Sequence, residues 1–284
     1  MSDNSGKTAL VVEGGGMRGI FAAGILHAFG REKFDPFDLY IGVSAGACHL
    51  ASHLAGQNDR NFDITLRYSL SSRFISPCRF LRGGHLMDLD WMWEQTISNY
   101  RLNLKYLFEN LRAKNKEYFV VATSMKTGKA LYLKPNENTL EDYLKISSSI
   151  PVFYRNILKV NGEPATDGGI ADAIPVRRAY ELGAKNIIVL RSRSSDYVKK
   201  QSPLTFILSF YFRKYPRLGE KIKTRAQNYM SAVNFIHHPP DGVRITELAP
   251  PENSGLSRTT QNEAALRTNY ETGIEYGYKF MKQW

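Results

Sequence analysis

Apolar residues fall into short continuous runs that alternate with longer segments of helical spacing. The runs 8–13 and 39–43 are largely apolar, as expected of strands buried on both faces of a parallel sheet. Helical patterns follow over 21–29 and over 45–73. This alternation of strand and helix predicts an α/β fold.

The rest of the chain continues the same succession. Strands are predicted over 117–125, 130–134, 185–191 and 243–248, helices over 87–98, 104–112, 140–146, 175–182 and 259–281, and loops at 76–77 and 82–84. We therefore expect a three-layer fold with a mostly parallel central sheet and helices on both faces. Because no repeat, low-complexity tract or linker interrupts the chain, residues 1–284 are expected to form a single domain.

The junction between the second strand and its helix reads Gly-Val-Ser-Ala-Gly at 42–46. Gly-x-Ser-x-Gly in this place is the pattern of a nucleophile elbow, where small residues flank a tight turn that lifts the serine hydroxyl clear of the backbone. The following helix would direct its unpaired amides at charge developing there. Ser44 is therefore the candidate nucleophile, and a plain turn is the alternative.

A second glycine-rich segment, Gly-Gly-Gly-Met-Arg-Gly at 14–19, joins the first strand to its helix. Its Gly-x-Gly-x-x-Gly spacing also occurs in dinucleotide sites, which need an acidic residue at the far end of the second strand. Here Asp38 precedes that strand, so a dinucleotide site is disfavoured. Neighbouring parallel strands end at one edge, and bare glycine N–H groups beside Ser44 would suit the oxyanion of an acyl transfer.

A nucleophilic serine needs a base to remove its proton. Asp167, in an Asp-Gly-Gly tripeptide at 167–169, offers a carboxyl group, although such a tripeptide is usually only a turn. The small residues at 147–151 form a bend of the kind that lines a pocket floor, and an ordinary helix stop at Pro151 is the alternative. Asp167 becomes a candidate base only in combination with Ser44.

Composition narrows the class of protein without changing the fold. The chain has 284 residues, of which 43% are hydrophobic and 23% charged, as in ordinary globular proteins. Cys48 and Cys78 have neither metal-ligand spacing nor a disulfide framework, which fits a reducing compartment. The chain start lacks a signal core, and no apolar run nears the roughly 20 residues of a membrane span. We expect a cytoplasmic protein with no metal or cofactor.

The formal net charge of +11 favours anionic partners. Aromatic and apolar residues followed by cations at 204–225 predict a peripheral contact with an anionic membrane surface, for example through a lid. A core helix followed by a solvated basic helix is the alternative. Binding to nucleic acid is not expected.

The three motifs at 14–19, 42–46 and 167–169, in this order, resemble the patatin-like phospholipase family. The resemblance covers roughly residues 8–190, whereas 191–284 carries no matching motif and is expected to extend the same domain. It implies a serine esterase of lipid metabolism that hydrolyses acyl esters of lipids with a Ser–Asp dyad and without histidine.

Carried over residue by residue, the resemblance implies that Ser44 is the nucleophile and Asp167 the general base. The N–H groups of Gly15 and Gly16 would form the oxyanion hole, and Arg18 would support that loop or meet a lipid phosphate. Supporting motif positions are Gly14, Gly19, Gly42, Gly46, Gly168 and Gly169.

Two positions depart from the family pattern. Glu13 stands where many members have aspartate before the glycines, a change typical of a bacterial branch that we expect to be benign. Ala173 stands where an asparagine often precedes the proline, here Pro175, and this removes a side chain that could orient Asp167.

Three other functions stay open at this point. An α/β-hydrolase with a Ser-Asp-His triad would use His237 or His238, although its elbow normally comes later in the chain. An acyl thioesterase would share the chemistry of the dyad. A non-catalytic protein that binds anionic lipid would keep the scaffold and use only the basic surface.

Overall fold

The computed structural model describes residues 6–201, 205 and 211–284. Its strands are β1 (Lys7–Val12), β2 (Leu39–Val43), β3 (Glu117–Ser124), β4 (Ala130–Leu133), β5 (Leu158–Val160), β6 (Glu163–Asp167), β7 (Ala184–Leu190) and β8 (Arg244–Leu248). Its α-helices are α1 (Ile20–Arg31), α2 (Ala45–Leu54), α3 (Arg60–Ile64), α4 (Pro77–Leu81), α5 (Leu89–Asn99), α6 (Leu104–Ala113), α7 (Leu140–Ser148), α8 (Val176–Glu181), α10 (Pro216–Lys223), α11 (Arg225–His237) and α12 (Glu263–Gln283). Short 3₁₀-helices η1 (Gly16–Gly19) and η3 (Gly168–Ile170) and the π-helix η2 (Thr65–Ser69) lie between them.

The described strands form an eight-stranded sheet in the order β5-β6-β3-β2-β1-β7-β8, with β4 also paired to β3. The central pairs are parallel: β1 with β2 and β7, β2 with β3, and β7 with β8. β4 and β6 run antiparallel to β3, and β5 runs antiparallel to β6. The predicted, mostly parallel sheet is confirmed, and it brings the carboxyl ends of β1 and β2 to one edge.

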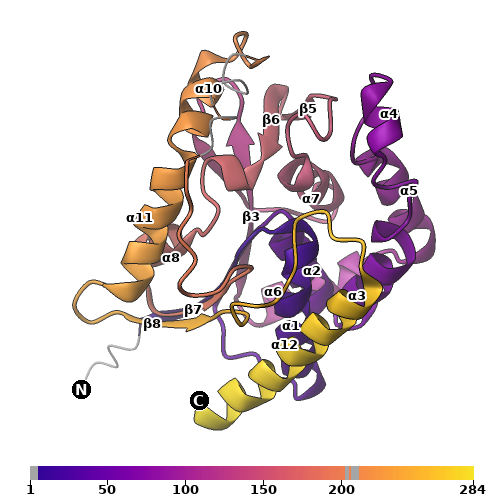
Figure 1. Cartoon of the computed structure of the whole chain (residues 1–284). Helices are drawn as coiled ribbons and strands as arrows, with labels where there is room; N and C mark the ends of the chain where they lie inside the picture. Colours follow the sequence, from indigo (N-terminus) through magenta and orange to yellow (C-terminus); the bar gives the residue numbers. More distant parts are fainter. Residues whose placement is uncertain (1–5, 202–204, 206–210) are drawn as a thin grey trace.

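Alternate residues of the central strands pack on opposite faces of the sheet. Leu10 and Val12 pack among residues of α1, α2 and α6, whereas Val11 and Ile41 pack among residues of α8 and α11. The predicted helices on both faces are confirmed, with α8 and α11 on one side and α1, α2 and α6 on the other (Figure 1). Burial on both faces explains why these strands read as apolar runs without alternation.

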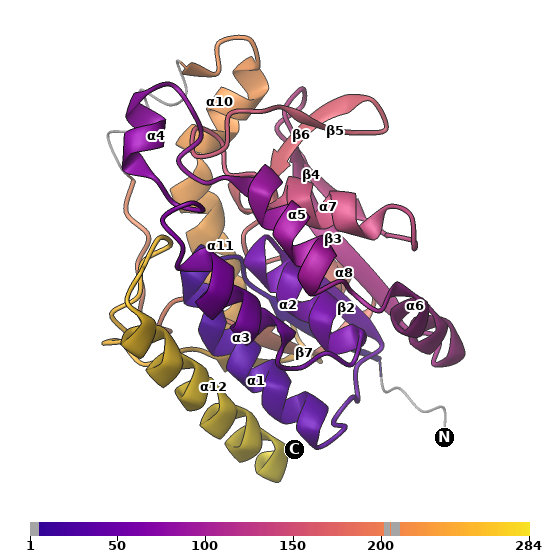
Figure 2. The same ribbon diagram turned by 90° about the vertical axis from the view of Figure 1, so that its right-hand side faces the viewer.

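The last helix, α12, lies along α1 on the outside of the molecule (Figure 2). Leu266, Tyr270 and Phe280 face inward and are buried. This is the closing helix that the pattern at 259–281 predicted, and it returns the end of the chain to the layer that the first helix began.

Two predicted segments differ in the structure. The helix expected over 45–73 is broken after α2, where Gly56 adopts φ +70°, a left-handed conformation that ends helices and suits glycine. The helix α4 begins at Pro77, inside the loop predicted at 76–77, and ends before the loop predicted at 82–84. Ser76 caps it by accepting a hydrogen bond from the Arg79 N–H (3.2 Å), and Pro77 occupies the first turn, so Ser-Pro here marks a helix start.

The segment 204–225, predicted to contact membranes, lies partly outside the described residues. In its described part, Leu218 and Ile222 of α10 pack against Met125 and Ile170. These two residues therefore belong to the core, and the membrane contact stays a prediction. No helix in the described ranges is long and apolar enough to cross a bilayer.

Candidate active site

Ser44 occupies the sharp turn between β2 and α2. Its backbone lies at φ 54° and ψ −127°, a region that costs a non-glycine residue on the order of 1–3 kcal/mol. A Cβ on Gly42 would come within 2.5 Å of the Ala47 Cα, and one on Gly46 within 2.5 Å of the Val12 carbonyl oxygen. The flanking glycines are thus required by close backbone approach, and the turn has the geometry of a nucleophile elbow.

The glycine-rich loop lies directly beside this elbow. A Cβ on Gly14 would stand 3.1 Å from the Cβ of Ser44, and Gly16 adopts φ +58°. Within the described residues, the N–H groups of Gly15 and Gly16 donate no backbone hydrogen bond, whereas that of the next residue, Met17, donates to a carbonyl. The two glycine N–H groups are therefore available to a bound molecule.

Asp167 ends β6 and is buried, with 5% of its surface exposed. Its Oδ1 accepts a hydrogen bond from the Gly169 N–H (2.9 Å), and its carbonyl accepts one from the Thr123 hydroxyl (2.8 Å). Burial raises the pKa of the Asp167 carboxyl above its ordinary value, and Arg225 and Arg258 oppose this rise. The nearby Ser44 side chain also opposes this rise in the pKa, and Ser44 and Asp167 line the same pocket.

The bend after α7 supports both residues. The Ser147 hydroxyl accepts a hydrogen bond from the Ser44 N–H (2.7 Å) and donates one to the Val121 carbonyl of β3 (2.6 Å). The Ser149 carbonyl accepts a hydrogen bond from the Asp167 N–H (3.2 Å). The small-residue bend at 147–151 therefore holds Ser44 and Asp167 in position relative to each other. This is a larger role than ending a helix at Pro151.

Glu13 anchors the glycine-rich loop through a buried network. Its carboxylate accepts hydrogen bonds from Arg191 Nε (3.1 Å), the Ser192 N–H (2.7 Å) and the Tyr229 hydroxyl (3.0 Å). Arg191 is fully buried and also pairs with Glu247 of β8. The departure at Glu13 is thus accommodated, because its longer side chain reaches a cation that neutralises its charge.

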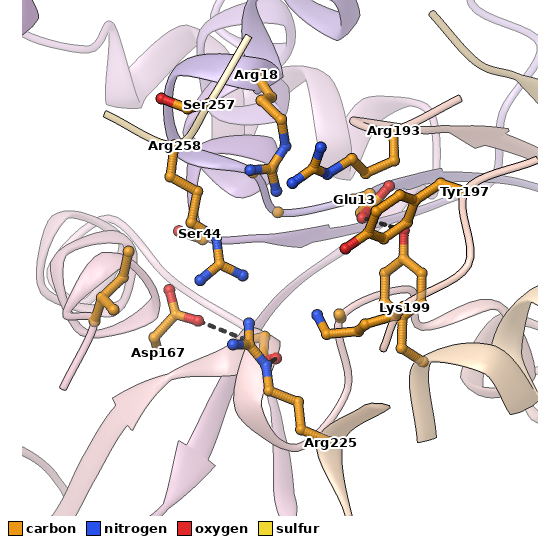
Figure 3. A pocket seen from close by; sticks show the side chains of 17 residues that line it. Glu13, Arg18, Ser44, Asp167, Arg193, Tyr197, Lys199, Arg225, Ser257 and Arg258 are labelled. Carbon is orange, nitrogen blue, oxygen red and sulfur yellow. Dashed lines mark hydrogen bonds between the residues drawn. The ribbon is translucent and has the colours of Figure 1, made fainter. Parts of the chain in front are cut away.

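Two cavities meet at Ser44. The first, of about 380 Å³, is called the cationic pocket here and is lined by Asp167, Glu13 and the basic residues Arg18, Arg193, Lys199, Arg225 and Arg258. Figure 3 shows these charged groups directed toward one space beside Ser44 and Asp167. The second, of about 150 Å³, is called the apolar pocket and is lined mainly by residues such as Met17, Ile20, Phe74, Leu89, Met92 and Leu144. Ser44, Gly16, Ile150 and Arg258 line both.

Ala173, at the position of the family's asparagine, lines the cationic pocket without a side-chain polar atom. In the described chain, the carboxyl of Asp167 is oriented by the Gly169 N–H instead. The backbone of the Asp-Gly-Gly turn therefore supplies a contact that orients the aspartate.

The two histidines considered for a triad lie elsewhere. His237 Nε2 pairs with Glu247 (3.2 Å), and His238 contacts the Asn234 carbonyl (3.3 Å). They lie at the carboxyl end of α11, whose last residue is His237 and whose first residue, Arg225, lines the cationic pocket. Twelve residues at about 1.5 Å each separate the two ends by about 18 Å, which is far beyond the reach of a proton transfer.

A different histidine, His49, lines the apolar pocket together with Ser44. Burial lowers its pKa to about 4. An imidazole with so low a pKa is neutral at pH 7 and a weaker base than an ordinary histidine. In the described ranges, no group of three or more His, Cys, Asp or Glu side chains could hold a metal ion.

The sequence pointed to Ser44, Asp167 and the two glycine motifs, and the structure brings them together at one edge of the sheet. It did not point to Arg193, Lys199 or Arg258, because no motif marks them. In the structure the Arg193 guanidinium lies over Tyr197 (4.5 Å) and the Lys199 ammonium over Tyr229 (4.6 Å). Tyr197 is close to Arg193 in the sequence, whereas Tyr229 meets Lys199 only through the fold.

Fold and site together describe an α/β protein with a strained serine elbow, a glycine-rich loop beside it and a buried aspartate. A family model described as patatin-like phospholipase matches residues 10–180, more than half of the chain. The chain belongs to the patatin-like phospholipase family, as its three motifs predicted. A second model, a domain of unknown function (DUF6363), matches residues 215–284.

Several known proteins are similar to this chain. Uncharacterized protein YjjU of Escherichia coli is 35% identical over 97% of this chain and 77% of its own length. Lysophospholipase NTE1 of Kluyveromyces lactis is 23% identical over 96% of this chain, which spans only 19% of that protein. Among solved structures, VipD from Legionella pneumophila aligns with a TM-score of 0.47 and 13% identity over 98% of this chain and 67% of VipD.

Proposed function

We propose that the protein is a serine hydrolase that cleaves acyl esters of lipids, with Ser44 as nucleophile and Asp167 as general base. The observation that carries this proposal is the position of Ser44, strained and beside a buried carboxyl, where an apolar pocket meets a cationic one. A lipid ester has a matching form, because its apolar acyl chain and its polar alcohol part lie on opposite sides of the ester bond. The name of the NTE1 relatives, lysophospholipase, agrees with it.

The first half of the reaction forms an acyl-enzyme. The Ser44 oxygen attacks the acyl carbonyl while its proton passes to Asp167, and the N–H groups of Gly15 and Gly16 receive the oxyanion. The ester C–O bond then breaks, and Asp167 gives its proton to the departing alcohol oxygen. The acyl group remains on Ser44.

The second half repeats these steps with water. Asp167 takes a proton from the water that attacks the acyl carbon, the bond to the Ser44 oxygen breaks, and the proton returns to that oxygen. The products are the carboxylic acid and free Ser44. The raised pKa of Asp167 supports its role, because burial makes this carboxyl a stronger base than an aspartate in water.

The test is a hydrolysis screen with p-nitrophenyl esters, acyl-CoAs and lysophospholipids, run on the wild-type chain and on Ser44→Ala. We expect hydrolysis of a lipid ester by the wild type and a loss of at least about 10³-fold in Ser44→Ala. A folded Ser44→Ala variant with wild-type rates would contradict the proposal. Absence of any Ser44-dependent hydrolysis would favour a binding protein instead.

A further inference from the structure

The cationic pocket holds more positive charge than the dyad needs. Five basic side chains line it: Arg18, Arg193, Lys199, Arg225 and Arg258. Of the two carboxylates there, Glu13 is already paired with Arg191, which leaves Asp167 alone against the five. No salt bridge among the described residues involves any of these five cations.

The five cations also repel one another. Burial, together with the charges of Arg193 and Arg258, lowers the pKa of Arg18 to about 10. Burial and the charges of Arg225 and Arg258 together lower the pKa of Lys199 to about 7. Such an arrangement costs stability in the empty protein, and a bound anion would relieve that cost.

Arg18 gives a second, independent observation. Its side chain is buried, with 6% of its surface exposed, and its Nε has no hydrogen-bond partner within the described chain. A buried guanidinium N–H without a partner is costly, and it lines this pocket. Arg18 therefore has unused hydrogen-bonding capacity beside the space that a ligand would occupy.

We infer that the cationic pocket binds a phosphomonoester dianion, as carried by the glycerol phosphate headgroup of a lysophosphatidate-type lipid. This rests on the proposed function, because the headgroup would belong to the ester that Ser44 attacks. The acyl chain would then occupy the apolar pocket on the other side of Ser44.

The charge of the pocket selects among headgroups. Guanidinium groups bind phosphate oxygens in bidentate fashion, and charge-assisted hydrogen bonds are roughly twice as strong as neutral ones. Arg18 and Arg258 reach the pocket from the glycine-rich loop side, and Lys199 and Arg225 from the opposite side (Figure 3). A phosphomonoester presents up to two negative charges to them. A choline headgroup would bring a further cation into a site that is already positive, which the pocket disfavours.

The experiment compares two lysolipids with the same acyl chain, oleoyl-lysophosphatidate and oleoyl-lysophosphatidylcholine. We expect the wild type to favour lysophosphatidate in kcat/KM by at least about tenfold. Lys199→Gln and Arg193→Gln should each reduce this preference about tenfold. Lys105→Gln and Arg31→Gln remove exposed cations far from the pocket and should keep the preference.

A binding arm separates the headgroup from a free phosphate compound. We expect Ser44→Ala to bind glycerol 3-phosphate in calorimetry and to ignore glycerophosphocholine, with the affinity weakened about tenfold by adding Lys199→Gln. Glycerol phosphate binding without lysophosphatidate preference would overturn the headgroup assignment in favour of a free phosphate ligand. If the protein neither binds glycerol 3-phosphate nor prefers lysophosphatidate, the proposed anion site is wrong. Loss of all Ser44-dependent hydrolysis would instead overturn the proposed function and, with it, the assignment of the lipid as substrate.

Discussion

The two pockets that meet at Ser44 differ in the chemistry of the side chains that line them. The apolar pocket is lined mainly by residues between Met17 and Ile150, and most of its wall is apolar. The cationic pocket takes most of its charge from the second half, through Arg193, Lys199, Arg225 and Arg258. One pocket favours contact with hydrocarbon, and the other favours contact with an anion.

This difference suggests a separate role for each of the two regions that match a family model, residues 10–180 and 215–284. Residues 10–180, which match the patatin-like phospholipase model, contain Ser44, Asp167 and most of the apolar pocket. Arg225 and Arg258 lie within 215–284, the second match. We therefore expect changes in the second region to alter which headgroup is preferred, and changes in the first to alter catalysis itself and the choice of acyl chain.

The largest effect is expected at the proposed dyad of Ser44 and Asp167, which lies where the two pockets meet. Asp167→Asn keeps the shape and a hydrogen bond but cannot accept the proton, so hydrolysis of every ester should fall by roughly 10²-fold to 10⁴-fold. The measurement is kcat on a soluble p-nitrophenyl ester and on a lysolipid.

The matched control is the double variant His237→Ala/His238→Ala. It should retain most activity, because His237 pairs with Glu247 of β8 and His238 contacts the Asn234 carbonyl, both at the end of α11 that lies away from Arg225 and the cationic pocket. A folded double variant as inactive as Ser44→Ala would make the triad the better account. Full activity in Asp167→Asn would remove the aspartate from the mechanism.

A smaller effect should separate the apolar pocket from the cationic one. Thr96→Phe adds a ring to the apolar wall, so long-chain esters should lose about tenfold in kcat/KM while an acetyl ester changes little. Thr268→Phe places the same ring on the exposed side of α12 and should leave both esters unaffected. Equal losses for long and short acyl groups would show that this cavity does not hold the chain.

The smallest effect is a shift in pH dependence on the cationic side. Asp167 acts as a base only when ionised, so activity is lost as the pH falls through its pKa. Arg225 lowers that pKa; Arg225→Gln should raise it and move the acid limb to higher pH by about one unit or less. The profile is measured with p-nitrophenyl butyrate, with Arg31→Gln as control. A limb that stays in place or moves to lower pH would contradict this coupling.

Local patterns predicted the elbow and the strands because the causes are local. Gly42 is needed because of its close approach to Ala47 within the same strand, turn and helix. Gly46 approaches Val12 of β1, a contact that the parallel pairing of β1 with β2 supplies. The run at 39–43 coincides with β2 because a strand buried on both faces needs no polar residue.

The cationic pocket could not be predicted in this way. Arg193 and Lys199 lie in the loop after β7, Arg225 begins α11 and Arg258 precedes α12. Each one alone looks like an ordinary surface cation. Arg225 was counted among residues predicted to meet a membrane, yet its side chain donates to the Gly169 carbonyl (2.7 Å) beside Asp167. Tertiary structure alone decides which basic residues converge.

The central claim is that Ser44 is an activated nucleophile, and covalent labelling tests it most directly. A fluorophosphonate places phosphorus where the acyl carbon would react, so it forms a stable bond only with a serine that the site activates. Peptide mass spectrometry of the labelled wild type should find the probe on Ser44, and Ser44→Ala should remain unlabelled under the same conditions. A probe attached to another serine in an active preparation, or unchanged labelling of Ser44→Ala, would contradict the account.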